Sequence, residues 1–162
     1  MEAKQPDDDI RHLRRALQLA DEHMRAGHGG PFGAVVVRNG VMLGEGWNQV
    51  TTAGDPTAHA EMVAIREACR ACGDHRLTGA VLYASCEPCP MCLAAAWWAR
   101  IGRIVFAGSR ADAAAAGFDD AEIYAEIGRD LAGRQLPVSR LLPDEGAAVV
   151  RSWLGFVGRV PY

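Results

Sequence analysis

The chain has 162 residues, 49% of them hydrophobic and 23% charged, which suits one globular domain with a buried core. Its formal net charge of −3 gives no general support for binding a polyanion such as tRNA or DNA. No apolar run approaches the roughly 18 to 20 residues of a membrane span, and the acidic N-terminus lacks the apolar core of a signal peptide, so we expect a cytoplasmic protein.

The first elements are a helix and a glycine-rich loop. Apolar residues recur at helical spacing between Asp8 and about Ala26, which predicts an amphipathic helix. The stretch 27–33 is a loop by composition, and a flexible connector is one interpretation of it. In the other interpretation its glycines let the backbone approach a ligand closely, while Phe32 offers a flat apolar wall for a ring.

A hairpin follows this loop. The β-prone runs 34–38 and 41–47 are joined by Asn39-Gly40, a pair typical of a tight hairpin turn. Asn48 comes directly after the second run. Its amide either caps a turn or donates and accepts hydrogen bonds, as recognition of a base requires.

The next helix is expected to begin near His59, with either Asp55 or Thr57 as its cap. Glu61 then lies in the first turn, where the positive end of the helix favours the ionised carboxylate. Helical spacing predicts one buried face, which consists of Met62, Ile65, Cys69 and Cys72.

A buried strand at 80–85 is expected to lead into another helix, for which Pro90 is a suitable first-turn residue. Cys89 and Cys92 then lie at the helix N-terminus, where the dipole lowers the pKa of a thiol and favours thiolate ligands. Two tryptophans continue this helix, and we expect at least one of them in the core: Trp97 and Trp98.

The remaining chain alternates strands with helices. We expect strands at 103–107 and 135–142 and helices at 112–117, 118–124 and 145–157. Together with the hairpin, this order predicts an α/β fold, a three-layer α/β/α sandwich with a mixed sheet of about five strands. No repeat, low-complexity tract or linker divides residues 1–162, so we expect a single domain.

A split motif organises the chain: His59 with Glu61 two positions later, then Cys89 and Cys92 with a proline on each side of the first cysteine. One imidazole and two thiolates suit zinc, and three protein ligands leave a fourth position for water. H-x-E with P-C-x-x-C is the signature of zinc-dependent base deaminases. We therefore expect one zinc per chain, with Glu61 as a general base that does not bind the metal.

The five cysteines also allow a structural alternative. Cys69-x2-Cys72 and Cys89-x2-Cys92 have the spacing of a four-cysteine zinc site, as in a non-catalytic module. Against it, the first pair continues an apolar helical stripe, and such a site would leave His59 without a role. An odd number of cysteines does not suit a disulfide framework, which agrees with a reducing compartment.

The order of elements and both zinc motifs resemble the cytidine deaminase superfamily. Within it, the chain is similar to the bacterial guanine deaminases from about residue 10 to the C-terminus. The zinc motifs specify only the superfamily, whereas Phe118-Asp119-Asp120 and the terminal Tyr162 carry the narrower resemblance. The other matching segments are 30–33, 55–61, 85–92 and 123–124.

This resemblance implies deamination of guanine to xanthine and ammonia, with Glu61 and Asp120 as catalytic residues that move protons. It also implies a homodimer, exchanged through the C-terminal segment, in which Tyr162 closes the neighbour's site. The residues that would contact the purine are Phe32, Asn48, Ala60, Trp98, Asp120 and Tyr162.

Other substrates stay open at this point. Guanosine, cytosine or a pterin-like molecule could undergo the same chemistry, and so could adenosine in tRNA. A clustered basic face around the site would favour the tRNA substrate. A zinc with two thiolates and one imidazole has a net charge near zero, so it acidifies water less than a three-histidine site does. A base close to the metal is therefore needed for any of these substrates.

Overall fold

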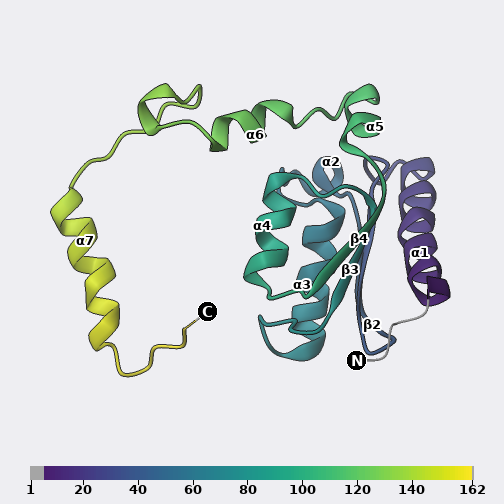
Figure 1. The fold of residues 1–162 in the computed structure, drawn as a ribbon, viewed down its shortest axis with the longest axis horizontal. Coiled ribbons are helices and arrows are strands. Elements are labelled where there is room, and N and C mark those ends of the chain that lie inside the picture. The colour runs from purple at the N-terminus through teal and green to yellow at the C-terminus, as the bar shows by residue number, and fades with distance from the viewer. Residues whose placement is uncertain (1–5, 162) are drawn as a thin grey trace. The chain divides into compact units, whose positions relative to one another are not determined.

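The structure is a computed structural model that describes residues 6–161 (Figure 1). The chain divides into two units, Met1–Asp120 and Ala121–Tyr162, which we describe separately. The first unit contains a mixed sheet with the strand order β2-β1-β3-β4. The prediction of a mixed sheet is confirmed, but the sheet has four strands rather than five.

The sheet is built around a central antiparallel strand. β1 (Gly33–Arg38) pairs antiparallel with β2 (Val41–Trp47) and with β3 (Val81–Cys86), and β3 pairs parallel with β4 (Arg103–Gly108). Asn39 and Gly40 both have positive φ, which is what the predicted tight hairpin turn requires.

Helices cover both faces of this sheet, as Figure 1 shows. α1 (Pro6–Arg25) packs on one face, where its Leu19 joins a core cluster of β1 and β3 side chains. On the other face, α3 (Ala60–Cys72) and α4 (Pro90–Trp98) contribute small residues to a second cluster. The three layers of the predicted sandwich are thus present in the first unit.

The contact between β2 and α3 depends on two glycines. A Cβ atom on Gly44 would lie 2.5 Å from the carbonyl oxygen of Ala64, and one on Gly46 would lie 2.5 Å from that of Ala60. Any side chain at these positions would therefore push the helix away from the strand. Because Ala60 is the first residue of α3, this contact also fixes the position at which the helix begins.

Both helices of that face begin at the same edge of the sheet. β2, β3 and β4 run in one direction, since β1 is antiparallel to β2 and β3, and β4 is parallel to β3. α4 follows β3 closely, and α3 follows β2 after the short helix α2 (Val50–Ala53). The edge at which strands end is the common position of a ligand site in an α/β sheet.

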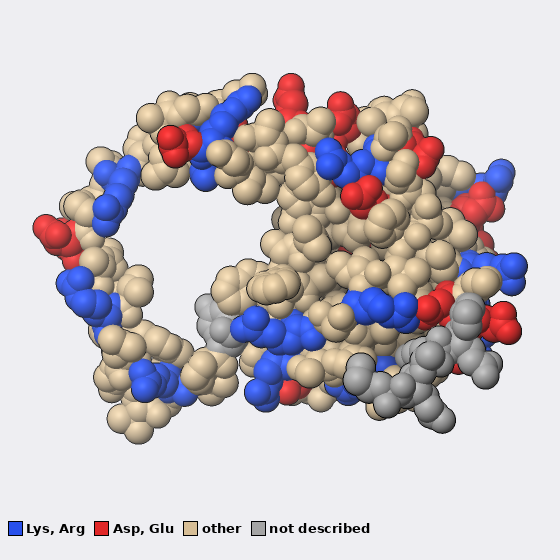
Figure 2. All heavy atoms as spheres, in the orientation of Figure 1, with Lys and Arg blue, Asp and Glu red and all other residues tan. Residues whose placement is uncertain are grey.

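The first unit ends with the short helix α5 (Arg110–Ala115), which begins with a capping box of Ser109 and Asp112. Trp97 and Trp98 are 75% and 57% exposed, so the expectation that one of them is in the core is wrong. Helix α4 turns its small residues to the sheet instead, and Ala96 is buried there. Figure 2 shows an uncharged surface over α4.

The second unit contains short helices and no strand among residues 121–161. The predicted strand at 135–142 is wrong, because extended backbone becomes a strand only where another strand pairs with it. The backbone N–H groups of Gln135 and Leu136 instead donate hydrogen bonds to the carboxylate of Glu126. The elements of this unit are α6 (Ala121–Ile127), η1 (Leu131–Gly133), α7 (Pro143–Ser152) and η2 (Trp153–Gly155).

Neither α6 nor α7 has a buried residue. Many large apolar side chains of this unit are exposed, among them Ile127, Leu136, Leu141, Val149 and Leu154. Within residues 6–161, the helices all fall short of the length and apolar character that crossing a bilayer demands. The cytoplasmic location stays a prediction.

Candidate active site

The metal-ligating side chains come from two helix N-termini. His59 is the N-cap of α3 and Cys89 is the N-cap of α4, and neither side chain forms a capping hydrogen bond. The predicted cap, Asp55 or Thr57, is wrong. The carboxylate of Asp55 accepts hydrogen bonds from the backbone N–H and the hydroxyl of Thr57, so both are engaged before the helix begins.

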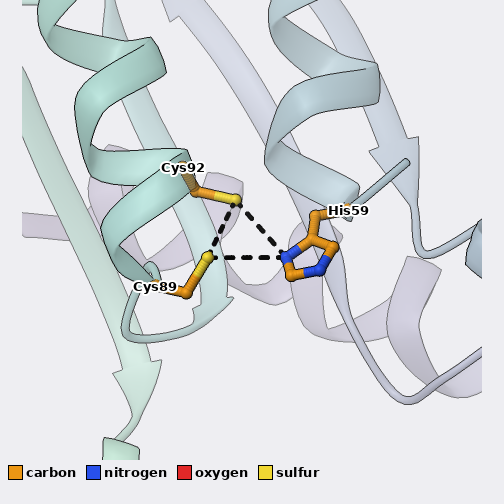
Figure 3. Close-up of side chains that lie close together, drawn as sticks. All are labelled: His59, Cys89 and Cys92. Carbon is orange, nitrogen blue, oxygen red and sulfur yellow. Dashed lines mark hydrogen bonds between the residues drawn. The ribbon is translucent and has the colours of Figure 1, made fainter. Parts of the chain in front are cut away.

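Three ligand atoms face one another, as Figure 3 shows. His59 Nδ1 lies 3.6 Å from the Sγ atoms of both Cys89 and Cys92, and the two sulfurs are 3.6 Å apart. Zinc bonds of about 2.3 Å to sulfur and 2.0 to 2.1 Å to nitrogen give tetrahedral edges of about 3.8 and 3.5 Å. The three atoms therefore fit one face of a zinc tetrahedron.

The charges of these ligands are also suited to a cation. A hydrogen bond between the two cysteine sulfurs lowers the pKa of Cys89. The same bond, together with burial, raises the pKa of Cys92. The two sulfurs therefore share one proton, and a divalent cation that replaces it binds two thiolates.

Glu61 lies in the first turn of α3 and is only 8% exposed. Burial raises the pKa of its carboxyl group above the usual range. A hydrogen bond from the backbone N–H at the helix N-terminus lowers this pKa, as predicted, but the effect of burial is larger. A carboxylate with a raised pKa is a better proton acceptor near neutral pH. Glu61 is thus suited to general acid–base catalysis beside the metal ligands.

A cavity of about 410 Å³ reaches His59 from the glycine-rich loop. Asn48 lines it and is 8% exposed. Its Oδ1 accepts hydrogen bonds from the backbone N–H groups of Gly30 and Val50, at 3.4 and 3.2 Å. These two donors require an oxygen at that position, so the NH2 group of the Asn48 side chain can donate a hydrogen bond to a ligand.

Aromatic rings form part of this region. Phe118 lines the cavity and packs edge-to-face on Phe32, with ring centroids 4.9 Å apart. The sequence predicts Phe32 as a wall for the ring, whereas it indicates Phe118 only as part of a motif. The position of Phe118 directly before two aspartates is the signal that could have indicated a role in the site. The sequence alone does not show that Phe118 packs on Phe32, which is far away along the chain.

The other predicted contacts are placed as follows. Ala60 is fully buried at the start of α3, and Asp120 Oδ1 lies 3.2 Å from Nε of Arg110. Trp98 is at the end of α4, remote from the turn that carries Cys92. Tyr162 lies outside the described residues. The substrate roles of these four residues stay predictions.

The four-cysteine alternative is wrong. Within the described part of the chain, the only His, Cys, Asp or Glu cluster suited to a metal is His59, Cys89 and Cys92. Cys69 and Cys72 are partly buried and pack against the core instead. Cys86 is also no member of the cluster, and its thiol donates to the carbonyl of Ser109.

Comparison with known proteins agrees with this geometry. Residues 6–108 match the model of the cytidine and deoxycytidylate deaminase zinc-binding region. The chain belongs to this family of zinc-dependent deaminases, and zinc is the metal for which its three ligands are arranged.

Within that family, the chain is 47% identical to the guanine deaminase of Bacillus subtilis over 93% of this chain and 96% of that protein. The crystal structure of that guanine deaminase matches with a TM-score of 0.91 at 46% identity, over 94% of this chain and 98% of that one. These values confirm the resemblance that the motifs indicated.

More distant relatives share parts of the fold. The structure of a guanine deaminase from Nitrosomonas europaea matches with a TM-score of 0.67 at 27% identity, over 96% of this chain and 88% of that one. A tRNA-specific adenosine deaminase of Haemophilus influenzae is 43% identical, but only over 62% of this chain and 58% of that protein. The likeness to a tRNA deaminase is therefore confined to part of the chain.

Proposed function

We propose that the protein deaminates guanine hydrolytically, with xanthine and ammonia as products. The observation that carries this proposal is the cavity that joins His59 to the amide of Asn48 and the ring of Phe118. It places a hydrogen-bond donor and an aromatic wall beside the ligands of a catalytic zinc. The near full-length match to a guanine deaminase favours guanine over the other bases.

The metal ligands, Glu61 and Asn48 have different roles in this reaction. His59, Cys89 and Cys92 would hold the zinc ion, which would act as a Lewis acid and make a water molecule more nucleophilic. Glu61 takes one proton from this water and passes it to the ring nitrogen, then takes the second from the added hydroxyl group and passes it to the leaving amine. The amide of Asn48 donates to an acceptor atom of the base and so fixes which carbon faces the site.

The substrate is tested by ammonia release from guanine, guanosine, adenine, cytosine and a tRNA, each with the purified zinc-loaded protein. We expect guanine to be turned over far faster than the others. Faster release from guanosine or tRNA would contradict the guanine assignment but keep the zinc chemistry. Release from none of them would contradict deamination of this whole group of substrates.

We also propose a homodimer in which the C-terminal segment of each chain packs on its partner, so that both units form one functional domain. Residues 121–161 include no buried side chain, and the helices of this unit expose apolar side chains that another surface would have to cover. The first unit exposes an apolar surface of its own on α4 and β4, which consists of Leu93, Trp97, Trp98 and Phe106. A second copy supplies both surfaces at once.

Mixed dimers test this exchange. One chain carries Glu61→Gln, the other lacks Tyr162, and each homodimer is expected to be nearly inactive. In an exchanged dimer, one of the two sites has an intact glutamate from one chain and an intact tyrosine from the other. We expect the tagged and purified heterodimer to regain about half of the wild-type activity. A heterodimer as inactive as both parents would contradict the exchange.

A further inference from the structure

Two histidines connect the glycine-rich loop to the strand that ends at Asn48. His23, near the end of α1, lies flat on the indole of Trp47, with ring centroids 3.6 Å apart and an interplanar angle of 1°. Its Nδ1 is 3.0 Å from Nδ1 of His28 in the loop. Trp47 directly precedes Asn48, so the stack reaches the amide that lines the cavity.

The loop beyond His28 is held closely against Asn48. Gly29 has a φ of 155°, and a Cβ atom on it would lie 1.8 Å from the carbonyl oxygen of Asn48. The next N–H, that of Gly30, donates to Asn48 Oδ1, and the carbonyl of His28 accepts from the hydroxyl of Thr52. A shift of His28 therefore moves the groups that orient the Asn48 amide.

One cation and two carboxylates lie around the histidine pair. Arg15 of α1 forms two hydrogen bonds with Glu45 of β2, at 3.0 and 2.9 Å, and lies 3.8 Å from Glu22. Burial and the neighbouring His28 lower the pKa of His23, despite the two carboxylates. His23 therefore stays neutral at a pH at which an isolated imidazole begins to take up a proton.

We propose that His23 and His28 are positioning residues for purine binding, whose mutual hydrogen bond holds Gly29 and Gly30 against Asn48. The bond needs one ring nitrogen with a proton and one without. It therefore survives while the pair carries at most one extra proton, and it is lost when both rings are protonated. The purine should then bind more weakly in acid. This inference rests on the proposed guanine site.

The sign of the effect follows from the direction of the shift. A base whose pKa is lowered by folding contributes its interaction above the usual pKa and loses it as the pH falls through the lowered value. We expect KM for guanine to rise about fivefold between pH 7.5 and pH 5, the size of one lost hydrogen bond.

Two substitutions of the exposed His28 separate positioning from titration. His28→Asn keeps a donor and an acceptor near the place of Nδ1 but has no proton to gain. We expect His28→Asn to keep the wild-type KM for guanine at pH 7.5 and not to show the fivefold rise in KM at pH 5. His28→Leu removes the bond, so its KM should be about fivefold higher at both pH values, with kcat within about twofold of wild type.

His75→Asn is the matched control, because this histidine lies in the turn after α3 and outside the cavity. Its KM should follow the wild type at every pH. The inference is overturned if His28→Leu has a wild-type KM at pH 7.5, or if His28→Asn keeps the full rise in acid.

Nitrogen-15 NMR of the imidazole rings, without purine, provides a readout that does not depend on activity. In the zinc-loaded protein, His28→Asn should raise the titration midpoint of His23, since the repulsion between the rings is gone. A changed midpoint in a protein that does not turn over guanine would contradict the proposed function alone. Guanine turnover with unchanged KM values would contradict the positioning role alone.

Discussion

Replacing Glu61 with Gln is expected to leave the zinc content at one ion per chain and to lower kcat for guanine by about 10²- to 10⁴-fold. Gln has nearly the size of Glu and stays neutral, so the buried first turn of α3 keeps its packing. It has no carboxylate to accept a proton. The loss therefore measures general acid–base catalysis rather than a damaged fold.

The measurement combines metal analysis with steady-state kinetics on the same preparation. Glu67→Gln serves as the matched control, because Glu67 is an exposed residue of the same helix that pairs with Arg70. The control should have a kcat within about twofold of wild type, as surface substitutions usually do. If Glu61→Gln kept a tenth of the wild-type kcat or more, the general-base role would be wrong.

Replacing Cys92 with Ala is expected to abolish both zinc binding and turnover. Cys92 is fully buried, and its sulfur lies 3.6 Å from each of the other two ligand atoms. Two remaining ligands do not hold zinc firmly against dilution or a chelator. Metal analysis should therefore give near-zero zinc in this variant after dialysis.

Thermal unfolding gives the same test in terms of stability. Free zinc at about a hundred times its Kd stabilises the wild-type fold by about 2.7 kcal/mol. For a chain of this length, that corresponds to a rise in Tm of about 5 to 10 °C. Cys92→Ala should show no such rise.

The double substitution Cys69→Ser with Cys72→Ser is the control for cysteine content. These residues pack against the core and belong to no metal cluster of residues 6–161. This variant should keep one zinc per chain and the rise in Tm. Loss of zinc from it would contradict the assignment of the three ligands.

The parts of the molecule that local chemistry determines could be predicted. The cysteine pair of the ligand set follows from its spacing of three residues, because such a spacing places both side chains within one helical turn. The hairpin at Asn39-Gly40 follows from the backbone conformation that this pair favours. The mixed sheet follows from the order of strands and helices.

The parts that depend on distant neighbours could not be predicted. A strand at 135–142 needs a pairing partner, and Trp97 needs a surface to pack against, which local patterns do not reveal. The stack of His23 on Trp47 joins residues of a helix and a strand, and no local spacing indicates it. Helix propensity likewise did not show that His59 itself is the cap of α3.

The order of the elements along the chain affects how the protein matures. The metal ligands and the two core clusters all come before residue 106. The metal ligands and both core clusters are therefore complete while the ribosome is still adding the C-terminal segment, and domains made first generally fold first. Zinc capture can thus precede assembly. For the proposed homodimer, dilution below its dissociation constant is then expected to expose the C-terminal segment to proteases while the metal stays bound.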